Sequence, residues 1–179
     1  MLETSRLIIA PLKIEEAEAF YEMLTNNFNR IKESFPKTSS ANTSLADSRK
    51  YIQEKIVEFE NKTFFSFGIC LKEENKLIGQ LAIKNIDWSI PKGELGYFID
   101  QTYEGKGIVT EALQKVIHYA FTDLKMNKLF LRTLLDNVAS QKVAEKNGFI
   151  KEGILRKEFK SGNNKLEDVI YYARLNPNI

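Results

Sequence analysis

The sequence predicts an α/β (α+β) protein with a mixed, mostly antiparallel twisted sheet of about seven strands, flanked by about four helices. Short apolar runs on either side of the polar turns at 72–76 and 161–164 indicate antiparallel hairpins. Between these hairpins, an apolar strand, a helical pattern and a second strand follow one another, and another unit of this kind comes next. Hairpins and strand–helix–strand units together predict a mixed sheet with helices on its faces.

The N-terminal part is expected to hold one strand and two helices. Apolar residues alternate through 6–12, which predicts the first strand. From Ile14, acids in the first turn and apolar residues at helical spacing predict a helix to about 24. A second amphipathic pattern predicts a helix over 44–60. Between the helices, a proline and a cluster of Ser, Thr and Asn make 30–43 a loop or a loosely helical connection.

The rest of the chain alternates strands with turns and helices. Apolar runs predict strands at 64–71 and 77–86, and 87–93 is expected to be a loop. Helical spacing from Ile108 predicts a helix to about 124, and Gly148 ends a shorter helix that begins near Asp136. The remaining strands are expected at 95–99, 128–135, 149–159 and 166–173.

Length and composition limit the class of protein. With 179 residues, of which 43% are hydrophobic and 28% charged, the chain is expected to form a single domain over 1–179. A net charge of +2 gives no reason to expect nucleic acid or a membrane surface as a partner. The sequence has no apolar run of ~18 residues and no signal-peptide pattern, so we expect a cytoplasmic protein.

The single cysteine and the single histidine do not suggest a metal site. Cys70 lies in an apolar run and is expected to be a buried, inert thiol. His118 lies within a predicted helix and has no Cys or His neighbour in the sequence. We therefore expect no metal, and neither zinc chemistry nor a Ser/His/Asp triad is indicated.

The most informative stretch is 94–113, where a strand, a glycine turn and a helix follow one another. Free N–H groups and the positive end of the helix dipole meet at such a helix start, and they favour a phosphate or pyrophosphate. Gly105 and Gly107 remove side chains that would keep a ligand away from the backbone. The stretch matches neither G-x-x-x-x-G-K-[ST] nor G-x-G-x-x-G, and two glycines in such a turn also have a purely steric explanation.

The segment Glu-Gly-Lys-Gly-Ile-Val at 104–109, followed by Thr-Glu-Ala-Leu, resembles the acetyl-CoA loop of the GNAT N-acetyltransferases. The order of elements, the Asn137-x-x-Ser140 pair and the Asn-Gly-Phe ending at 147–149 agree with that family. Glu-Leu-Gly-Tyr at 94–97 and Asp168-x-x-x-Tyr172 resemble the Rim-type branch, which acetylates the N-terminal amine of ribosomal proteins. The resemblance covers nearly the whole chain and implies the GNAT-type acyl-CoA N-acyltransferase fold.

The resemblance also implies acetyl-CoA as the cosubstrate. Its pyrophosphate would bind the backbone N–H groups of the glycine turn, and its pantetheine arm would lie along the strand before it. The sequence departs from the usual Q/R-x-x-G-x-G/A loop because Glu104 replaces Gln or Arg and Val109 replaces a small residue. The residues expected to bind the cofactor are Phe98, Ile99, Glu104, Gly105, Lys106, Gly107, Val109, Thr110 and Asn137.

Amine acetylation needs a neutral amine and a proton for the departing thiolate. Glu94 is a candidate base because desolvation in an apolar strand disfavours its charged form, although the solvated start of a strand is an equal alternative. Glu158 is the rival base, and water alone is a third choice. By resemblance Ser140 protonates the thiolate, although it also suits the first helical turn after Asn137, a favoured N-cap type.

The leading prediction is transfer of an acetyl group from acetyl-CoA to the N-terminal α-amine of a protein, of the ribosomal-protein type, by direct attack on the thioester. Such an amine needs only a modest base, because its unperturbed pKa is about 8, against about 10.4 for lysine. The alternatives are acetylation of a small amine, such as a polyamine or an aminoglycoside, and a CoA-binding module without catalysis. A homodimer through the last strand pair is expected from the family.

Overall fold

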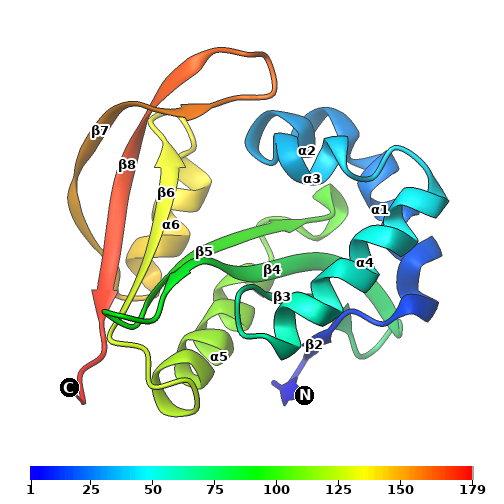
Figure 1. Cartoon of the computed structure of the whole chain (residues 1–179), viewed down its shortest axis with the longest axis horizontal. Helices are drawn as coiled ribbons and strands as arrows, with labels where there is room; N and C mark the ends of the chain where they lie inside the picture. The colour runs from blue at the N-terminus through cyan, green and yellow to red at the C-terminus, as the bar shows by residue number, and fades with distance from the viewer. Residues whose placement is uncertain (179) are drawn as a thin grey trace.

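One mixed sheet of eight strands organises residues 1–178 of the computed structural model, and Ile179 lies outside the described residues. The strand order is β1-β2-β3-β4-β5-β6-β8-β7, and within it β5 and β6 form the parallel pair (Figure 1). The strands are β1 (Leu2–Glu3), β2 (Leu7–Pro11), β3 (Phe65–Leu71), β4 (Lys76–Asp87), β5 (Lys92–Ile99), β6 (Lys128–Leu134), β7 (Ile150–Lys160) and β8 (Leu166–Leu175).

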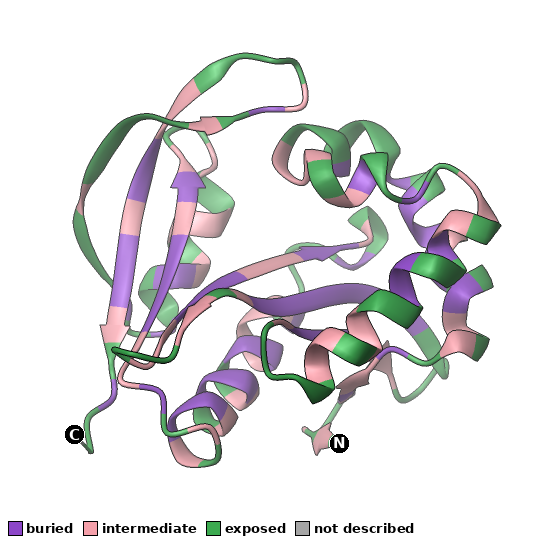
Figure 2. Cartoon of the chain, in the orientation of Figure 1, coloured by how far each residue is buried: buried purple, intermediate pink, exposed green. Residues whose placement is uncertain are grey.

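Helices lie on both faces of the sheet. The first group of helices and α5 pack on opposite faces, and their inward sides are buried (Figure 2). Within residues 1–178, no helix is long and apolar enough to cross a membrane. The helices are α1 (Ala17–Asn26), α2 (Phe28–Ser34), α3 (Pro36–Ser40), α4 (Leu45–Glu60), α5 (Ile108–Thr122) and α6 (Val138–Lys146), with 3₁₀ turns at Ile14–Glu16 and Gln101–Tyr103.

Two apolar clusters form the core, one on each face. The larger cluster joins the sheet to α5, where Leu113 and Val116 are completely buried. The smaller cluster joins the sheet to α1, α2 and α4 and includes the stacked rings of Phe20 and Tyr51, with centroids 5.6 Å apart. Burial of such side chains typically contributes about 1.5–3 kcal/mol each, so these clusters hold the sheet between its helices.

The parallel pair of the sheet separates soon after it begins. Only Lys92, Gly93 and Glu94 of β5 pair with β6 in the described sheet. Beyond that point β5 continues to pair with β4 as far as Ile99, and β6 continues to pair with β8 as far as Leu134. Figure 1 shows the two strands side by side at their starts and diverging afterwards. The divergence leaves one edge of β5 unpaired in the middle of the molecule.

The β7–β8 hairpin bridges this divergence by reaching to α2. Gly162 N donates a hydrogen bond of 3.2 Å to the Glu33 carbonyl oxygen, and Asn163 Nδ2 donates one of 3.3 Å to Glu33 Oε1. A Cβ on Gly162 would lie 2.2 Å from the Lys32 carbonyl oxygen, so this close approach requires glycine. The hairpin tip and α2 thereby connect the two halves of the sheet on the side of the shorter helices.

The predicted fold class is confirmed, with differences in the number of elements. The strand β1 has two residues, which is too short for any sequence pattern to show. Of the two alternatives for 30–43, a loop or a loosely helical connection, the structure has the helical one: Ile31 is buried in α2, and Pro36 occupies the start of α3, where its missing N–H costs nothing. The strand β5 begins at Lys92, before the predicted apolar run, because pairing on both sides supports it.

We expect Gly162→Ala to lower the free energy of unfolding by about 1–3 kcal/mol, the usual cost of forcing a methyl group against packed atoms. The matched control is Gly153→Ala in the same hairpin, because a Cβ there would meet no atom within 4 Å. Urea unfolding of both variants provides the comparison. Equal unfolding midpoints would contradict a tight contact between the hairpin tip and α2.

Candidate active site

The glycine turn and the start of α5 form an open anion site. Gly107 is the N-cap of α5, and Gly105 and Gly107 have φ angles of 71° and 73°, a region that favours glycine. A Cβ on Gly105 would meet no atom within 4 Å, so the backbone of the turn is accessible. The first N–H groups of α5 lack intrahelical acceptors, and together with the helix dipole they favour a bound anion.

Contacts from neighbouring side chains fix the shape of this turn. Arg6 Nη1 donates a hydrogen bond of 3.1 Å to the Lys106 carbonyl oxygen, and Arg6 Nε donates one of 2.7 Å to Glu111 Oε2 in the first turn of α5. The Lys106 ammonium lies 5.1 Å from the centroid of the Tyr103 ring. These contacts hold the backbone of the turn beside the first turn of α5.

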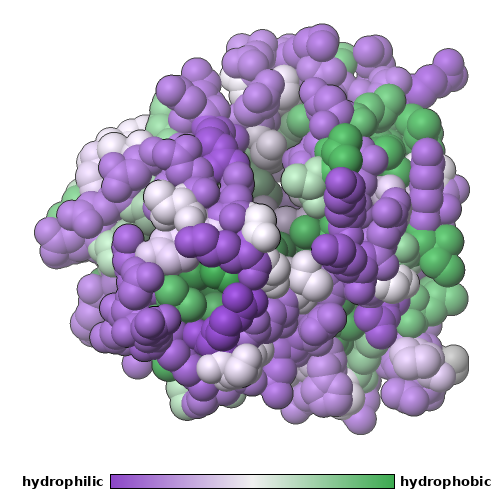
Figure 3. All heavy atoms as spheres, turned by 180° about the vertical axis from the view of Figure 1, so that it is seen from behind, coloured by the Kyte–Doolittle hydropathy of each residue, from purple (hydrophilic) through white to green (hydrophobic). Residues whose placement is uncertain are grey.

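A cleft of about 450 Å³ extends from the glycine turn to the start of α6. Seen from behind, the molecular surface is hollowed near its centre, and most of the rim is hydrophilic (Figure 3). The charged residues that line the cleft are Arg30, Lys142 and Lys146 against one acid, Glu104, so its lining is cationic overall. The residues predicted to bind the cofactor all line this cleft except Lys106: Phe98, Ile99, Glu104, Gly105, Gly107, Val109, Thr110 and Asn137.

The edge of β5 that faces the cleft carries open backbone groups. Asp100 N donates a hydrogen bond of 2.8 Å to the Ile78 carbonyl oxygen on β4. Because antiparallel residues alternate between hydrogen-bonded and non-hydrogen-bonded pairs, the backbone groups of Tyr97 and Ile99 point away from β4. They point into the gap left by β6. Of the two strand residues predicted to hold the pantetheine arm, Ile99 presents its backbone to the gap, whereas the backbone of Phe98 faces β4.

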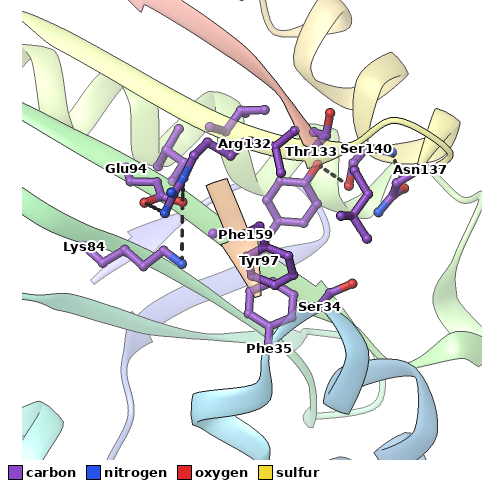
Figure 4. A pocket seen from close by; sticks show the side chains of 15 residues that line it. Ser34, Phe35, Lys84, Glu94, Tyr97, Arg132, Thr133, Asn137, Ser140 and Phe159 are labelled. Atoms are coloured by element: carbon purple, nitrogen blue, oxygen red, sulfur yellow. Dashed lines mark hydrogen bonds and ion pairs between the residues drawn. The ribbon is translucent and has the colours of Figure 1, made fainter. Parts of the chain in front are cut away.

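A second, smaller cavity of about 120 Å³ adjoins the cleft (Figure 4). It is lined by residues from β4, β5, β6, β7 and β8, from the end of α2 and from the start of α6. A ligand in the cleft and a ligand in the cavity would meet beside the residues that line both. These shared residues are Ser34, Phe35, Tyr97, Asn137 and Ser140.

Ser140 stands at this junction and is hydrogen-bonded on both sides. The Tyr97 hydroxyl donates a hydrogen bond of 3.2 Å to Ser140 Oγ, and burial raises the pKa of Tyr97 to about 12, so its phenol stays protonated near neutral pH. Ser140 N donates to Asn137 Oδ1 at 3.0 Å, which makes Asn137 the N-cap of α6. Ser140 is therefore both a first-turn residue and a residue of the junction. Because its Oγ accepts from Tyr97, its own proton is available to a ligand.

Glu94 is buried rather than solvated, with 4% of its surface exposed. Its carboxylate accepts hydrogen bonds from Asn85 Nδ2 at 2.6 Å and from Arg132 Nη2 at 2.9 Å and Nε at 3.2 Å, and Lys84 Nζ lies 3.6 Å away (Figure 4). Both carboxylate oxygens thus have cationic partners. This arrangement compensates the buried charge, as a buried carboxylate requires, and it differs from the apolar surroundings that the sequence predicts.

Glu158 contacts the same arginine from the opposite side. Arg132 Nη1 donates to Glu158 Oε1 at 3.2 Å, and about half of the Glu158 side chain is exposed. The strand β7 bulges here: Lys157 has a φ of 54°, and its N–H donates to Asp168 Oδ1 at 3.0 Å. Arg132 therefore joins the two candidate bases that the sequence could not separate.

The side chains that surround Glu94 and Ser140 were not predicted as site residues. Arg132 has the clearest sequence signal, because a cation in the middle of the apolar strand 128–135 needs a counter-charge when buried. Tyr97 lies in the Glu-Leu-Gly-Tyr stretch, but no sequence pattern shows that its hydroxyl faces α6. Lys84 and Asn85 meet Glu94 only through the pairing of β4 with β5.

The fold, the glycine turn and the divergence of β5 from β6 define an acetyltransferase of the GNAT class. Residues 6–150 match the family model described as an acetyltransferase (GNAT) domain. The chain therefore belongs to the GNAT family and is an acetyl-CoA-dependent N-acetyltransferase, which confirms the resemblance that the sequence carries.

Two related acetyltransferases share sequence with most of the chain. It is 32% identical to the probable N-acetyltransferase YjcK of Bacillus subtilis, over 99% of this chain and 98% of that protein. It is 33% identical to the ribosomal-protein-serine acetyltransferase of Escherichia coli, over 74% of this chain and 72% of that protein.

Solved structures show the same architecture. The ribosomal-protein-S5-alanine acetyltransferase of Vibrio fischeri superimposes with a TM-score of 0.91 at 25% identity, covering 98% of this chain and 96% of that one. RimL, a ribosomal L7/L12 α-N-protein acetyltransferase solved in complex with coenzyme A, has a TM-score of 0.88 at 22% identity. That comparison covers 96% of this chain and 95% of RimL.

Proposed function

We propose that this protein, as a single N-acetyltransferase domain over residues 1–179, acetylates the N-terminal α-amine of a protein, of the ribosomal-protein type. The observation that carries the proposal is the meeting of two cavities at Tyr97 and Ser140. One cavity suits a long anionic cofactor, and the other suits the end of an acceptor. The names of the Escherichia coli and Vibrio fischeri relatives support the acceptor class.

Acetyl-CoA would occupy the larger cleft. Its pyrophosphate would meet the N–H groups of 105–110, where the charges of Lys142 and Lys146 compensate the phosphates. Its pantetheine arm would lie beside β5 and hydrogen-bond the open backbone groups of Tyr97 and Ile99. This placement brings the thioester to the junction, because Ser140 lines the cleft as well as the smaller cavity.

The acceptor would enter the smaller cavity. Its charged lining residues are Lys84, Arg132 and Glu94, so the cavity is not acidic and does not suit a polycation such as a polyamine. Thr133 Oγ1 is buried in its wall and has no hydrogen-bond partner within residues 1–178, so it is available to a polar group of the acceptor.

The reaction follows from these positions. The neutral amine attacks the thioester carbonyl carbon, the carbon–sulfur bond breaks, and Ser140 Oγ gives its proton to the departing thiolate. The proton that the new amide nitrogen loses returns to Ser140 Oγ, so the serine is restored and CoA leaves as the thiol. The Tyr97 hydroxyl, which donates to Ser140 Oγ, orients that proton toward the junction. The ammonium proton of the acceptor must leave before the attack, and its loss needs only a modest base because an α-amine has a pKa of about 8.

The contacts of the two candidate bases favour Glu158 over Glu94. Both carboxylate oxygens of Glu94 are held by cationic or amide partners and so are already engaged within the protein. Glu158 makes one contact to Arg132 and about half of its side chain is exposed, so part of its carboxylate is open to water. In this proposal Glu94 holds Arg132 in place, and Arg132 positions Glu158.

Incubation with acetyl-CoA and matched peptides tests the acceptor class. We expect a peptide with a free N-terminal amine to release CoA thiol and gain one acetyl group. The same peptide with a blocked N-terminus and an internal lysine is the control and should react far more slowly. Spermidine serves as the small-amine comparison. If no peptide with a free N-terminal amine reacts, the proposed acceptor class is wrong, and a reaction with spermidine in its place would assign a small amine as the acceptor.

Replacement of the residues at the junction separates their roles. We expect Ser140→Ala and Glu158→Gln each to lower kcat on the order of 10²-fold, the lower range for loss of one acid or base. Binding of CoA, measured by calorimetry, should stay within about threefold of wild type, because neither side chain reaches the glycine turn. Glu94→Gln is the comparison: a larger loss of kcat there than in Glu158→Gln, with unchanged stability, would assign the base to Glu94 instead.

A further inference from the structure

The cofactor cleft is lined by one acidic residue, Glu104, although an anionic cofactor would favour cationic residues there. Glu104 directly precedes the glycine turn and lines the cleft together with the open N–H groups of Gly105 and Gly107. A carboxylate beside bound phosphates repels them, and this effect weakens binding unless a cation lies nearby. The position is therefore unfavourable for Glu104 alone.

Arg30 of α2 supplies that cation. Its guanidinium forms an ion pair with Glu104, and both side chains line the cleft. The two side chains are 44% and 48% exposed, so the pair is open to a ligand. Within residues 1–178, the Arg30 guanidinium donates to Glu104 alone, and it carries several further N–H donors suited to phosphate oxygens.

The helix that carries Arg30 is held in place at other points. Glu33 accepts the hydrogen bonds from the hairpin tip. Phe35, just after the helix, packs edge-on against Phe98 of β5, with ring centroids 5.4 Å apart. The guanidinium is therefore presented from a fixed backbone, which lowers the entropy lost when it binds a ligand.

We infer that Arg30 is a phosphate-binding residue of this protein, which Glu104 directs toward the pyrophosphate of acetyl-CoA at the glycine turn. Glu104 contributes to cofactor binding only together with Arg30, and without Arg30 it opposes binding. The inference rests on the proposed placement of acetyl-CoA in the cleft. Helix α2 would then touch both ligands. Arg30 would meet the cofactor phosphates, and Ser34 at the end of the same helix lines both the cleft and the smaller cavity.

Calorimetric binding of CoA to four proteins tests this inference: wild type, Arg30→Ala, Glu104→Gln and the double variant. We expect Arg30→Ala to weaken CoA binding by about tenfold or more, the size of one lost charge-assisted contact. Glu104→Gln should change binding by less than about threefold in the wild-type background. In the Arg30→Ala background the same substitution should tighten binding, because it removes an uncompensated like charge.

Pantetheine and a distant arginine provide the controls. Pantetheine lacks the pyrophosphate, so Arg30→Ala should leave its affinity unchanged. Arg49→Ala on α4 makes the same change in net charge outside both cavities and should leave CoA binding unchanged. Exposed ion pairs add little to stability, so the thermal midpoint of Arg30→Ala should match wild type. If Arg30→Ala does not fold, Arg30→Lys keeps the charge without the planar fork and should show a smaller loss of affinity.

The possible outcomes separate this inference from the proposed function. Unchanged CoA affinity in Arg30→Ala, while wild type binds CoA, overturns the inference alone. Equal weakening of CoA and pantetheine also overturns it, because that result assigns Arg30 to the structure of α2 rather than to phosphate binding. Failure of wild type to bind CoA overturns the placement of the cofactor and, with it, the proposed function.

Discussion

The early separation of β5 from β6 is the constraint on which the site depends. After Glu94 and Phe130 the two strands no longer pair, so backbone groups in the middle of the sheet lose their usual partners. Buried backbone groups must find other partners, and along β5 the cleft makes a ligand available to them. The same separation opens the space in which Tyr97 reaches Ser140. The glycine turn then continues β5 directly into the anion site.

Arg132 supplies the counter-charge for Glu94, which is buried where the two strands separate. A carboxylate at Glu94, buried where the strands part, would be costly without a counter-charge. Arg132 on the neighbouring strand supplies it, and another N–H of the same guanidinium donates to Glu158. One guanidinium therefore both neutralises the buried Glu94 and contacts Glu158. The hairpin bulge held by Asp168 places Glu158 within that reach.

What the sequence could predict follows from the range of the interactions. The glycine turn, the α5 start and the pair of Asn137 and Ser140 are local patterns, and the structure shows each of them in the predicted place. The surroundings of Glu94 depend on the register of β5 against β4 and β6, which no local pattern encodes. The contact of Arg30 with Glu104 spans 74 positions in the chain and was equally hidden.

Amide hydrogen exchange on the ¹⁵N-labelled protein, with and without CoA, tests most directly whether the separated edge of β5 holds the cofactor. The account predicts that CoA protects the amides of Tyr97 and Ile99 and those of the glycine turn at 105–110. The amides of Gly96 and Phe98, which face β4, should change little. Protection of Gly96 and Phe98 in place of Tyr97 and Ile99, or no protection along β5 while CoA is bound, would contradict it.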